Sequence, residues 1–201
     1  MKLIFATNNR HKVEEMQAAI GDAFQLITLK EAGIDIDIPE PHPTLEANAT
    51  EKSQTIYRLT GIDCFSEDTG LETEALNGEP GVISARYACP EPVEGAGDEK
   101  APEKNMEKLL QKLQPHTNRR ARFRTVISLI LDGREFLFEG ICPGTIETAP
   151  RGAGGFGYDP IFTPDGASQT FGQMSLEQKA VYSHRRKAAD KLVLFLQRPS
   201  R

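Results

Sequence analysis

Apolar and polar residues follow strand and helix spacings in alternation along the first part of the chain. Residues 2–6 form a short, largely apolar run typical of a buried strand. The next apolar residues recur at helical spacing until Gly21 supplies a stop; they are Val13, Met16, Ala19 and Ile20. Residues 24–27 are a second strand candidate, and the capping-box pattern of residues 28–31 predicts a short helix that ends at Gly33.

The alternation continues to residue 70. An amphipathic helix is predicted over residues 44–60, because its apolar side chains form one stripe and Gly61 follows its end. Residues 62–66 read as a strand, and the acidic segment 67–70 ends in glycine. We therefore expect segment 67–70 to turn at the end of that strand.

The second half of the chain adds a hairpin to this pattern. An amphipathic helix is predicted around residues 106–113, followed by β-rich runs at residues 121–131 and 135–142. Asp132-Gly133 joins these two runs and is a strong hairpin signal. Strands that first alternate with helices and then form a hairpin predict an α/β fold, with a mixed central sheet and flanking helices.

Three further segments complete the pattern. Residues 89–102 are rich in proline, glycine and acidic residues and are predicted to form an exposed loop. Residues 150–160 are glycine-rich and irregular. A capping box at residues 175–178 opens a last helical region, which is predicted to continue through Leu196.

Composition and charge exclude several classes of protein. The chain has 201 residues, of which 38% are hydrophobic, and no apolar stretch approaches the roughly 20 residues that cross a bilayer. The apolar N-terminal run is shorter than a signal-peptide core, so we expect a cytoplasmic protein with no membrane partner. The net charge of −5 argues against a protein that grips long nucleic acid, but it leaves room for a small anionic ligand. The three cysteines are widely spaced and form no zinc or redox motif.

A first candidate site lies between the first strand and the first helix. Residues 7–12 read Thr-Asn-Asn-Arg-His-Lys, and helix N-terminal amides at such a junction attract anions. Small hydroxyl and amide side chains with a lysine on the first turn suit a phosphate group. The alternative is an ordinary helix cap by Asn8 or Asn9, with Lys12 in solvent.

Carboxylates supply a second candidate site. Glu40 stands between two prolines that stiffen the backbone, and a rigid carboxylate is a plausible magnesium ligand. Asn48 and Lys52 share one face of the predicted helix 44–60. The adjacent carboxylates of segment 67–70 would hold Mg²⁺ or activate water. The alternatives are a surface loop, a solvated helix face and an acidic turn.

Candidates for binding a base follow near the C-terminus. Residues 152–157 formally match G-x-G-x-x-G, but proline precedes the segment where a strand is needed, so it is not a dinucleotide fingerprint. Phe156 and Tyr158 offer flat surfaces on which a base could stack. Donors on His184 and Arg185 suit the carbonyl oxygens of a base edge. The alternatives are an irregular loop packed by aromatic residues and a charged surface helix end.

Together and in this order, these segments resemble the inosine triphosphate pyrophosphatase family, also called Ham1-like, over essentially the whole chain. The residues that carry the resemblance are Thr7, Asn9, Lys12, Glu40, the helix segment from Asn48 to Lys52, residues 67–70, Pro80-Gly81, residues 84–87, residues 155–160, Lys179 and residues 183–185.

The resemblance implies a single domain over residues 1–201, with two lobes around an active-site cleft, that assembles as a homodimer. It implies Mg²⁺-dependent hydrolysis of ITP, dITP and XTP to the monophosphate and pyrophosphate. Asp68 would be catalytic, and Asp68 and Glu40 would hold the metal. The implied substrate-binding residues are Thr7, Asn8, Asn9, Arg10, His11, Lys12, Lys52, Thr69, Phe156, Gly157, Tyr158, Asp159, Lys179, His184 and Arg185.

Hydrogen-bond donors near the base explain why ATP would be rejected. Donors that suit a 6-oxo group face the amino group of adenine, and buried donors then stay unpaired. Two other functions stay open at this point: a nucleotide sensor without catalysis, and a pyrophosphatase for another modified nucleotide.

Overall fold

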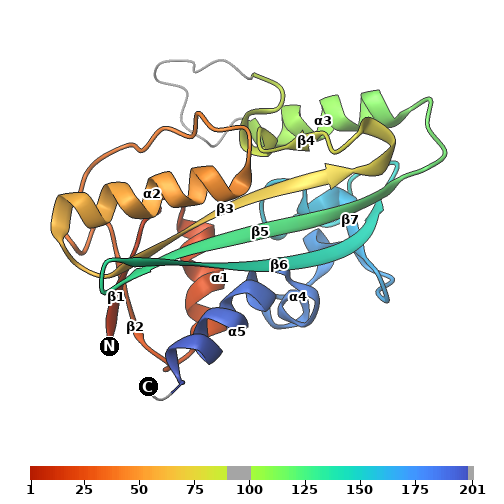
Figure 1. Ribbon diagram of the computed structural model, residues 1–201. Helices are drawn as coiled ribbons and strands as arrows, with labels where there is room; N and C mark the ends of the chain where they lie inside the picture. The colour runs from red at the N-terminus through yellow and green to blue at the C-terminus, as the bar shows by residue number, and fades with distance from the viewer. Residues whose placement is uncertain (90–100, 199–201) are drawn as a thin grey trace. The chain divides into compact units, whose positions relative to one another are not determined.

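The computed structural model describes residues 1–89 and 101–198 (Figure 1). In that part of the chain seven strands form one sheet in the order β2-β1-β3-β5-β6-β7, with β4 paired to β3. The strands are β1 (Lys2–Phe5), β2 (Gln25–Thr28), β3 (Cys64–Thr73), β4 (Pro80–Gly81), β5 (Arg120–Leu131), β6 (Arg134–Ile146) and β7 (Phe162–Pro164). The helices are α1 (Arg10–Ile20), α2 (Leu45–Thr60), α3 (Ala101–Leu113), α4 (Leu176–Tyr182) and α5 (His184–Leu196). The predicted mixed α/β fold is confirmed.

Contacts divide the chain into two compact units. Unit 1 comprises Met1–Asp68, Thr125–Ile141 and the chain from Ser183 onward. Unit 2 comprises Thr69–Arg124 and Cys142–Tyr182. Strands β3, β5 and β6 contribute residues to both units. The predicted site residues also fall into both, with Asp68 in unit 1 and Lys179 in unit 2.

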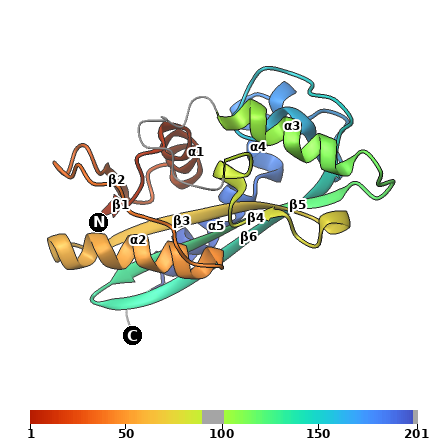
Figure 2. The same cartoon turned by 90° about the horizontal axis from the view of Figure 1, so that it is seen from above.

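The sheet of unit 1 is covered on both faces, by α2 on one and by α1 and α5 on the other (Figures 1 and 2). In β1, Leu3 and Phe5 join the core cluster with buried residues of α1 and α5. Ile4 and Ala6 point to the opposite face and join a smaller cluster with Ile56 of α2. Strand alternation in β1 therefore gives the unit a core on each face of its sheet.

The order of the strands brings the N-terminal loop to the acidic segment. Strand β1 runs parallel to β3, with Phe5 opposite Phe65. The backbone N–H of Ala6 donates to the carbonyl of Phe65 at 2.7 Å. Both strands continue in the same direction from this pair, so the loop that begins at Thr7 leaves the sheet next to Glu67.

Unit 2 has its own core. Buried side chains of α3, including Leu109 and Leu113, share one cluster with Phe123 of β5 and Phe162 of β7. The rings of Phe123 and Phe162 lie edge to face with centroids 4.7 Å apart. This core supports the irregular segment 150–160, whose Tyr158 belongs to the same cluster.

Elements with strong local signals form as predicted. Helix α2 begins after Thr44, whose hydroxyl accepts the N–H of Ala47 at 3.2 Å, and ends before Gly61, which has a left-handed φ of 66°. Asp132 and Gly133 adopt φ values of 50° and 74° and join β5 to β6. Two positive φ values in a two-residue loop are the requirement of a type I′ hairpin.

The short helix predicted after residue 28 is wrong. The predicted capping bonds do form: the Thr28 N–H donates to the Glu31 carboxylate at 2.8 Å, and the Glu31 N–H donates to the Thr28 hydroxyl at 3.2 Å. Thr28 nevertheless ends strand β2, and residues 29–33 form turns. The carboxylate also accepts from the hydroxyl of Thr28, so the box closes a tight turn instead of starting a helix.

The turn predicted at residues 67–70 is also wrong, because β3 continues through them to Thr73. Gly70 is not a turn residue. A Cβ atom built on Gly70 would lie 2.6 Å from the carbonyl oxygen of Gly81, in the strand β4 that pairs with β3. The glycine is needed for this close approach of two strands.

The last helical region is two helices and not one. Lys179 lies in α4 and belongs to unit 2, whereas His184 and Arg185 open α5 and belong to unit 1. The break occurs at Ser183, whose side chain accepts the backbone N–H of Arg186 and caps α5. The predicted capping box at the start of α4 is present, with the Gln178 N–H donating to the Ser175 hydroxyl at 3.2 Å.

Two further expectations concern exposure. Within the described residues, no helix is long and apolar enough to span a membrane. The predicted acidic loop 89–102 lies almost entirely outside the described residues. Cys89 at its start is exposed and Cys64 and Cys142 are buried, and none of the three forms a disulfide within the described residues.

Candidate functional site

The loop between β1 and α1 is ordered by its own side chains. The Thr7 hydroxyl accepts the N–H of Asn9 at 3.2 Å, and the Asn9 side chain caps α1 by accepting the N–H of Lys12 at 3.1 Å. Exposed Arg10 forms a 2.9 Å ion pair with Glu14. The capping role foreseen as the alternative therefore exists, and it leaves the positive end of α1 and Lys12 beside the loop.

Lys52 lies between the two predicted metal carboxylates. Its ammonium group is 2.5 Å from the Glu40 carboxylate and 3.1 Å from that of Asp68. Lys52 and Asp68 are buried, whereas Glu40 keeps 28% of its side chain exposed. Asn48, one helical turn before Lys52 on α2, donates to the second Asp68 oxygen at 3.4 Å. The structure thus brings Glu40, Lys52 and Asp68 together.

Burial and charge oppose each other in this cluster. Burial favours the neutral amine of Lys52, but the charges of Asp68 and Glu40 outweigh it and raise the pKa of the lysine. Burial also raises the pKa of Asp68, and the charge of Glu40 adds to that rise against the attraction of Lys52. Lys52 therefore stays a cation, and Asp68 takes up a proton more readily than an exposed aspartate.

A second ion cluster surrounds Glu67, which is fully buried on β3. Arg185 holds both oxygens of its carboxylate, through Nε at 2.7 Å and Nη2 at 2.9 Å. Lys12 reaches the same carboxylate at 3.3 Å, and Arg185 also pairs with Glu15 of α1. This network joins α1, β3 and the start of α5.

Opposite charge dominates the titration of this second cluster. Burial alone would raise the pKa of Glu67, but the charges of Arg185 and Lys12 lower it to about 2. Burial disfavours the charged guanidinium of Arg185, yet Glu67 and Glu15 raise its pKa above the ordinary value. The donors of Arg185 are directed at carboxylates, and a role in reading a base stays a prediction.

His184 opens α5 next to Arg185 and is 2% exposed. The helix start packs tightly on β6, because a Cβ atom on Gly140 would lie 2.0 Å from the His184 carbonyl oxygen. Gly140 thereby lets α5 approach the sheet closely enough to place His184 and Arg185.

Unit 2 brings together three of its predicted residues. The Asp159 carboxylate accepts from the Lys179 ammonium at 2.6 Å and from the backbone N–H of Phe156 at 2.9 Å. The same ammonium lies 5.0 Å from the centre of the Phe156 ring. A side chain on Gly155 would strike Asp159, since its Cβ atom would lie 2.1 Å from Oδ2, and this explains the glycine.

The other predicted residues of unit 2 are less closely grouped. Tyr158 is a core residue, and its hydroxyl donates to the Ser84 carbonyl at 2.8 Å, so Phe156 is the half-buried ring of the predicted stacking pair. Gly157 has a left-handed φ of 62°, and Thr69 lies within β3.

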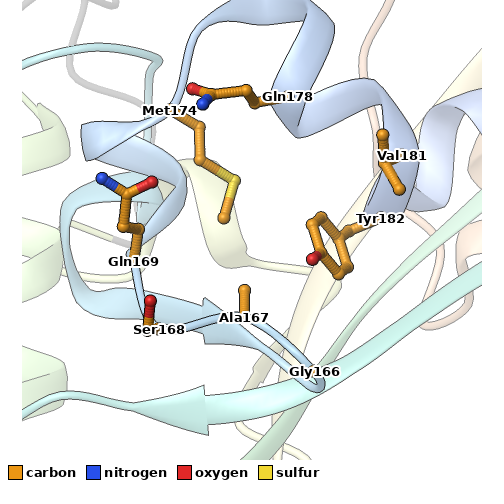
Figure 3. A pocket seen from close by; sticks show the side chains of 8 residues that line it. All are labelled: Gly166, Ala167, Ser168, Gln169, Met174, Gln178, Val181 and Tyr182. Atoms are coloured by element: carbon orange, nitrogen blue, oxygen red, sulfur yellow. The ribbon is translucent and has the colours of Figure 1, made fainter.

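A pocket of about 310 Å³ also opens in unit 2 (Figure 3). None of the predicted site residues lines it. Its lining residues are Gly166, Ala167, Ser168, Gln169, Met174, Gln178, Val181 and Tyr182.

The oxygen atoms of unit 1 fit a small divalent cation. Among residues 1–89 and 101–198, no group of three or more His, Cys, Asp or Glu side chains is arranged to hold a metal. Mg²⁺, however, is commonly held by one or two carboxylates together with substrate phosphates and waters. Glu40 and Asp68 already direct one oxygen each at the same cation, the Lys52 ammonium. This pair therefore fits the predicted magnesium ligands.

Comparison with known proteins places the chain in a family. A model described as the Ham1 family matches residues 3–195. The chain belongs to the Ham1 family. The dITP/XTP pyrophosphatase of Flavobacterium psychrophilum is 46% identical, over 97% of this chain and 98% of that protein. The dITP/XTP pyrophosphatase of Porphyromonas gingivalis is 45% identical, with 97% of each covered. The solved structure of the Staphylococcus aureus Ham1 protein matches with a TM-score of 0.84, at 39% identity and with 98% of each chain covered.

In this Ham1 family chain, sequence reasoning missed Glu15 and the ion-pairing role of Glu67. Glu15 pairs with Arg185, which is 170 positions away, and no local sequence pattern predicts that contact. Glu67 is predicted as one of two adjacent carboxylates that hold Mg²⁺, activate water or form an acidic turn, yet it is the centre of the second ion cluster. No local signal places Glu67 there, because its partner Arg185 lies 118 residues away in the chain.

Proposed function

We propose that this chain hydrolyses non-canonical purine nucleoside triphosphates (ITP, dITP and XTP) to the nucleoside monophosphate and pyrophosphate. The observation that carries the proposal is the buried Lys52 between Glu40 and Asp68, with the charge of Lys12 on α1 also acting on Asp68. Family membership and the names of the relatives support the same reaction. Such a reaction would remove unwanted nucleotides from the nucleotide pool.

The proposed chemistry divides between the two groups of residues. Thr7, Asn9, Lys12 and Lys52 would bind the triphosphate, which needs cations and N–H donors. Glu40 and Asp68 would hold Mg²⁺, which when bound supplies positive charge to the phosphates and makes a water more acidic. Asp68 would orient the attacking water and, as the family resemblance implies, accept its proton.

Recognition of the base is proposed for the remaining predicted residues. Phe156 would stack on the purine, with Asp159 and Lys179 beside it, and His184 and Arg185 would read the base edge. Residues 1–201 would act as one pyrophosphatase domain. The family resemblance also leads us to propose a cytoplasmic homodimer, whose assembly sedimentation would measure.

A pyrophosphate-release assay tests the proposed function. The purified protein is supplied with ITP, XTP, GTP, ATP, dUTP or dTTP, with and without Mg²⁺. We expect release from ITP and XTP that requires the metal, and little release from ATP or GTP. Activity confined to pyrimidines would identify a pyrophosphatase for another nucleotide. Tight ITP binding without release would identify a sensor, and either result would overturn the proposal.

Removal of the phosphate-binding lysines is expected to weaken substrate binding. Lys12→Ala and Lys52→Ala should each lower the affinity for ITP by about tenfold or more, since a charge-assisted contact contributes roughly 1.5–3 kcal/mol. Isothermal titration with ITP measures the effect, and exposed Lys30→Ala serves as the matched control. An unchanged affinity in both site variants would contradict the phosphate assignment.

A further inference from the structure

The connection between β2 and α2, drawn in orange in Figure 1, has a strict alternation that belongs to no strand. Ile34, Ile36 and Ile38 are half-buried, whereas Asp35 and Asp37 between them are exposed. We call residues 34–38 the isoleucine strap. In an extended chain every second side chain points the same way, so Glu40 is the next inward position after Ile38.

The isoleucine strap is docked on unit 1 by apolar contacts. Its three isoleucines pack against the cluster that contains Ile4, Ala6, Leu29, Ile56, Cys64 and Ile130. Ile56 lies on α2 one turn after Lys52, on the same side of the helix. The strap therefore lies along the side of α2 that carries Ile56 and Lys52. Because Glu40 points inward like the three isoleucines, its carboxylate contacts the Lys52 ammonium.

Three hydrogen-bonded points fix the connection around this apolar contact. At its start the Ile34 N–H donates to the Leu29 carbonyl at 2.9 Å. In its middle the Asn8 side-chain amide donates to the Ile36 carbonyl at 3.0 Å. Beyond Glu40, fully buried Asn48 holds both backbone groups of His42, accepting from its N–H at 2.9 Å and donating to its carbonyl at 3.2 Å.

We infer that the isoleucine strap, with Asn8, is a positioning device for Glu40, and that it sets the affinity of the site for a divalent cation. Asn8 then acts through the Ile36 backbone and Glu40. The inference rests on the proposed function only in taking Glu40 as a metal ligand. A carboxylate on a free loop would lose conformational entropy on binding a cation, and the docked strap has already restricted it.

The test measures metal binding without nucleotide, which separates it from substrate effects. Mn²⁺ alone serves as the probe, since it takes the same oxygen ligands, and the loss of its free-ion EPR signal reports binding. We expect Ile38→Ala to raise the dissociation constant by about three- to tenfold, a coupling of ordinary size, and Asn8→Ala to raise it by less. Exposed Asp37→Asn, on the outward side of the strap, is the matched control and should leave the dissociation constant unchanged. If only the charge of the strap mattered, Asp37→Asn would raise the constant and Ile38→Ala would not.

A double variant distinguishes positioning from general destabilisation. Glu40→Gln should weaken Mn²⁺ binding, and adding Ile38→Ala to Glu40→Gln should weaken it no further, because the strap acts through that carboxylate. Hydrogen exchange of residues 34–42 should rise in Ile38→Ala and in Asn8→Ala. Asn8→Ala removes one exposed hydrogen bond and leaves the core intact, so it keeps the test decisive if Ile38→Ala folds poorly.

The outcomes separate the two proposals. If Glu40→Gln weakens Mn²⁺ binding but the strap variants leave it unchanged, or add their full effect to Glu40→Gln, the strap inference is overturned and the pyrophosphatase proposal stands. If Glu40→Gln leaves Mn²⁺ binding unchanged, Glu40 is no metal ligand and the strap inference falls with it. The pyrophosphate-release assay on the unmodified protein then still decides the reaction.

Discussion

Asp68→Asn is expected to abolish pyrophosphate release while leaving measurable binding of ITP. The amide keeps the size of the carboxylate but loses its charge and its ability to accept a proton from water. General-base catalysis commonly contributes about 10²–10⁴-fold, so we expect kcat to fall by at least about 10²-fold. Lys52 retains its shorter contact to Glu40, at 2.5 Å, and can still meet the phosphates.

The measurement compares two quantities in the same variant. Pyrophosphate release gives kcat, and isothermal titration with ITP gives the affinity. Asp22→Asn makes the same chemical change at an exposed position and should leave both quantities unchanged. Equal losses of turnover and affinity in Asp68→Asn would show that Asp68 mainly holds the metal or the structure, and would remove its role toward water.

Local signals account for the elements that the sequence predicts correctly. Thr44 and Gly61 mark the two ends of α2, and each forms its capping hydrogen bond with a residue only three or four positions away. Asp132 and Gly133 are adjacent, and their two positive φ values form the hairpin turn. Such features depend on neighbours in the chain, so one sequence suffices to predict them.

The errors come from contacts between distant residues. Gly70 appeared to mark a turn, but its reason is Gly81, on a partner strand that the sequence does not identify. The helical spacing after residue 175 continued past Ser183, although that serine caps a new helix and separates Lys179 from Arg185. At such places the sequence predicts the local bonds correctly, but it does not predict where the surrounding strand or helix begins and ends.

The candidate site shows the same division. Lys52 could be placed on a helix face from spacing alone. Its contact with Glu40 depends on the isoleucine strap, whose alternation is visible in the sequence but pairs with no strand. Arg185 was assigned to a base edge because nothing near it in the chain points to Glu67, 118 residues away.

Glu67→Gln is expected to destabilise the protein by about 3–5 kcal/mol, because it leaves buried Arg185 without its bidentate carboxylate. Urea unfolding at pH 7 measures the free energy of unfolding. The exposed ion pair of Arg120 and Asp165 is the matched control, since it is also bidentate but 45% of each side chain is exposed. Asp165→Asn should cost less than about 1 kcal/mol.

The same carboxylate predicts how stability changes with pH. Although burial opposes it, the charges of Arg185 and Lys12 lower the pKa of Glu67 from its ordinary value of 4.5 to about 2 in the folded protein. Its contribution to stability is therefore complete above pH 4.5 and is lost as the pH falls from about 4.5 to about 2. In Glu67→Gln the free energy of unfolding should depend less steeply on pH within that window, and a slope equal to that of the unmodified protein would contradict the folded-state pKa.

A double-variant cycle with Arg185→Met separates the ion pair from simple loss of packing. Each single variant leaves one buried charge without its partner, whereas the double variant removes both charges. The double variant should therefore lose less free energy of unfolding than the sum of the two single losses, by about 0.5–3 kcal/mol. Strict additivity would mean that Glu67 and Arg185 contribute independently, through Lys12 and Glu15 respectively. In that case the second cluster would be two separate ion pairs, and the contact between β3 and α5 would contribute no coupling of its own.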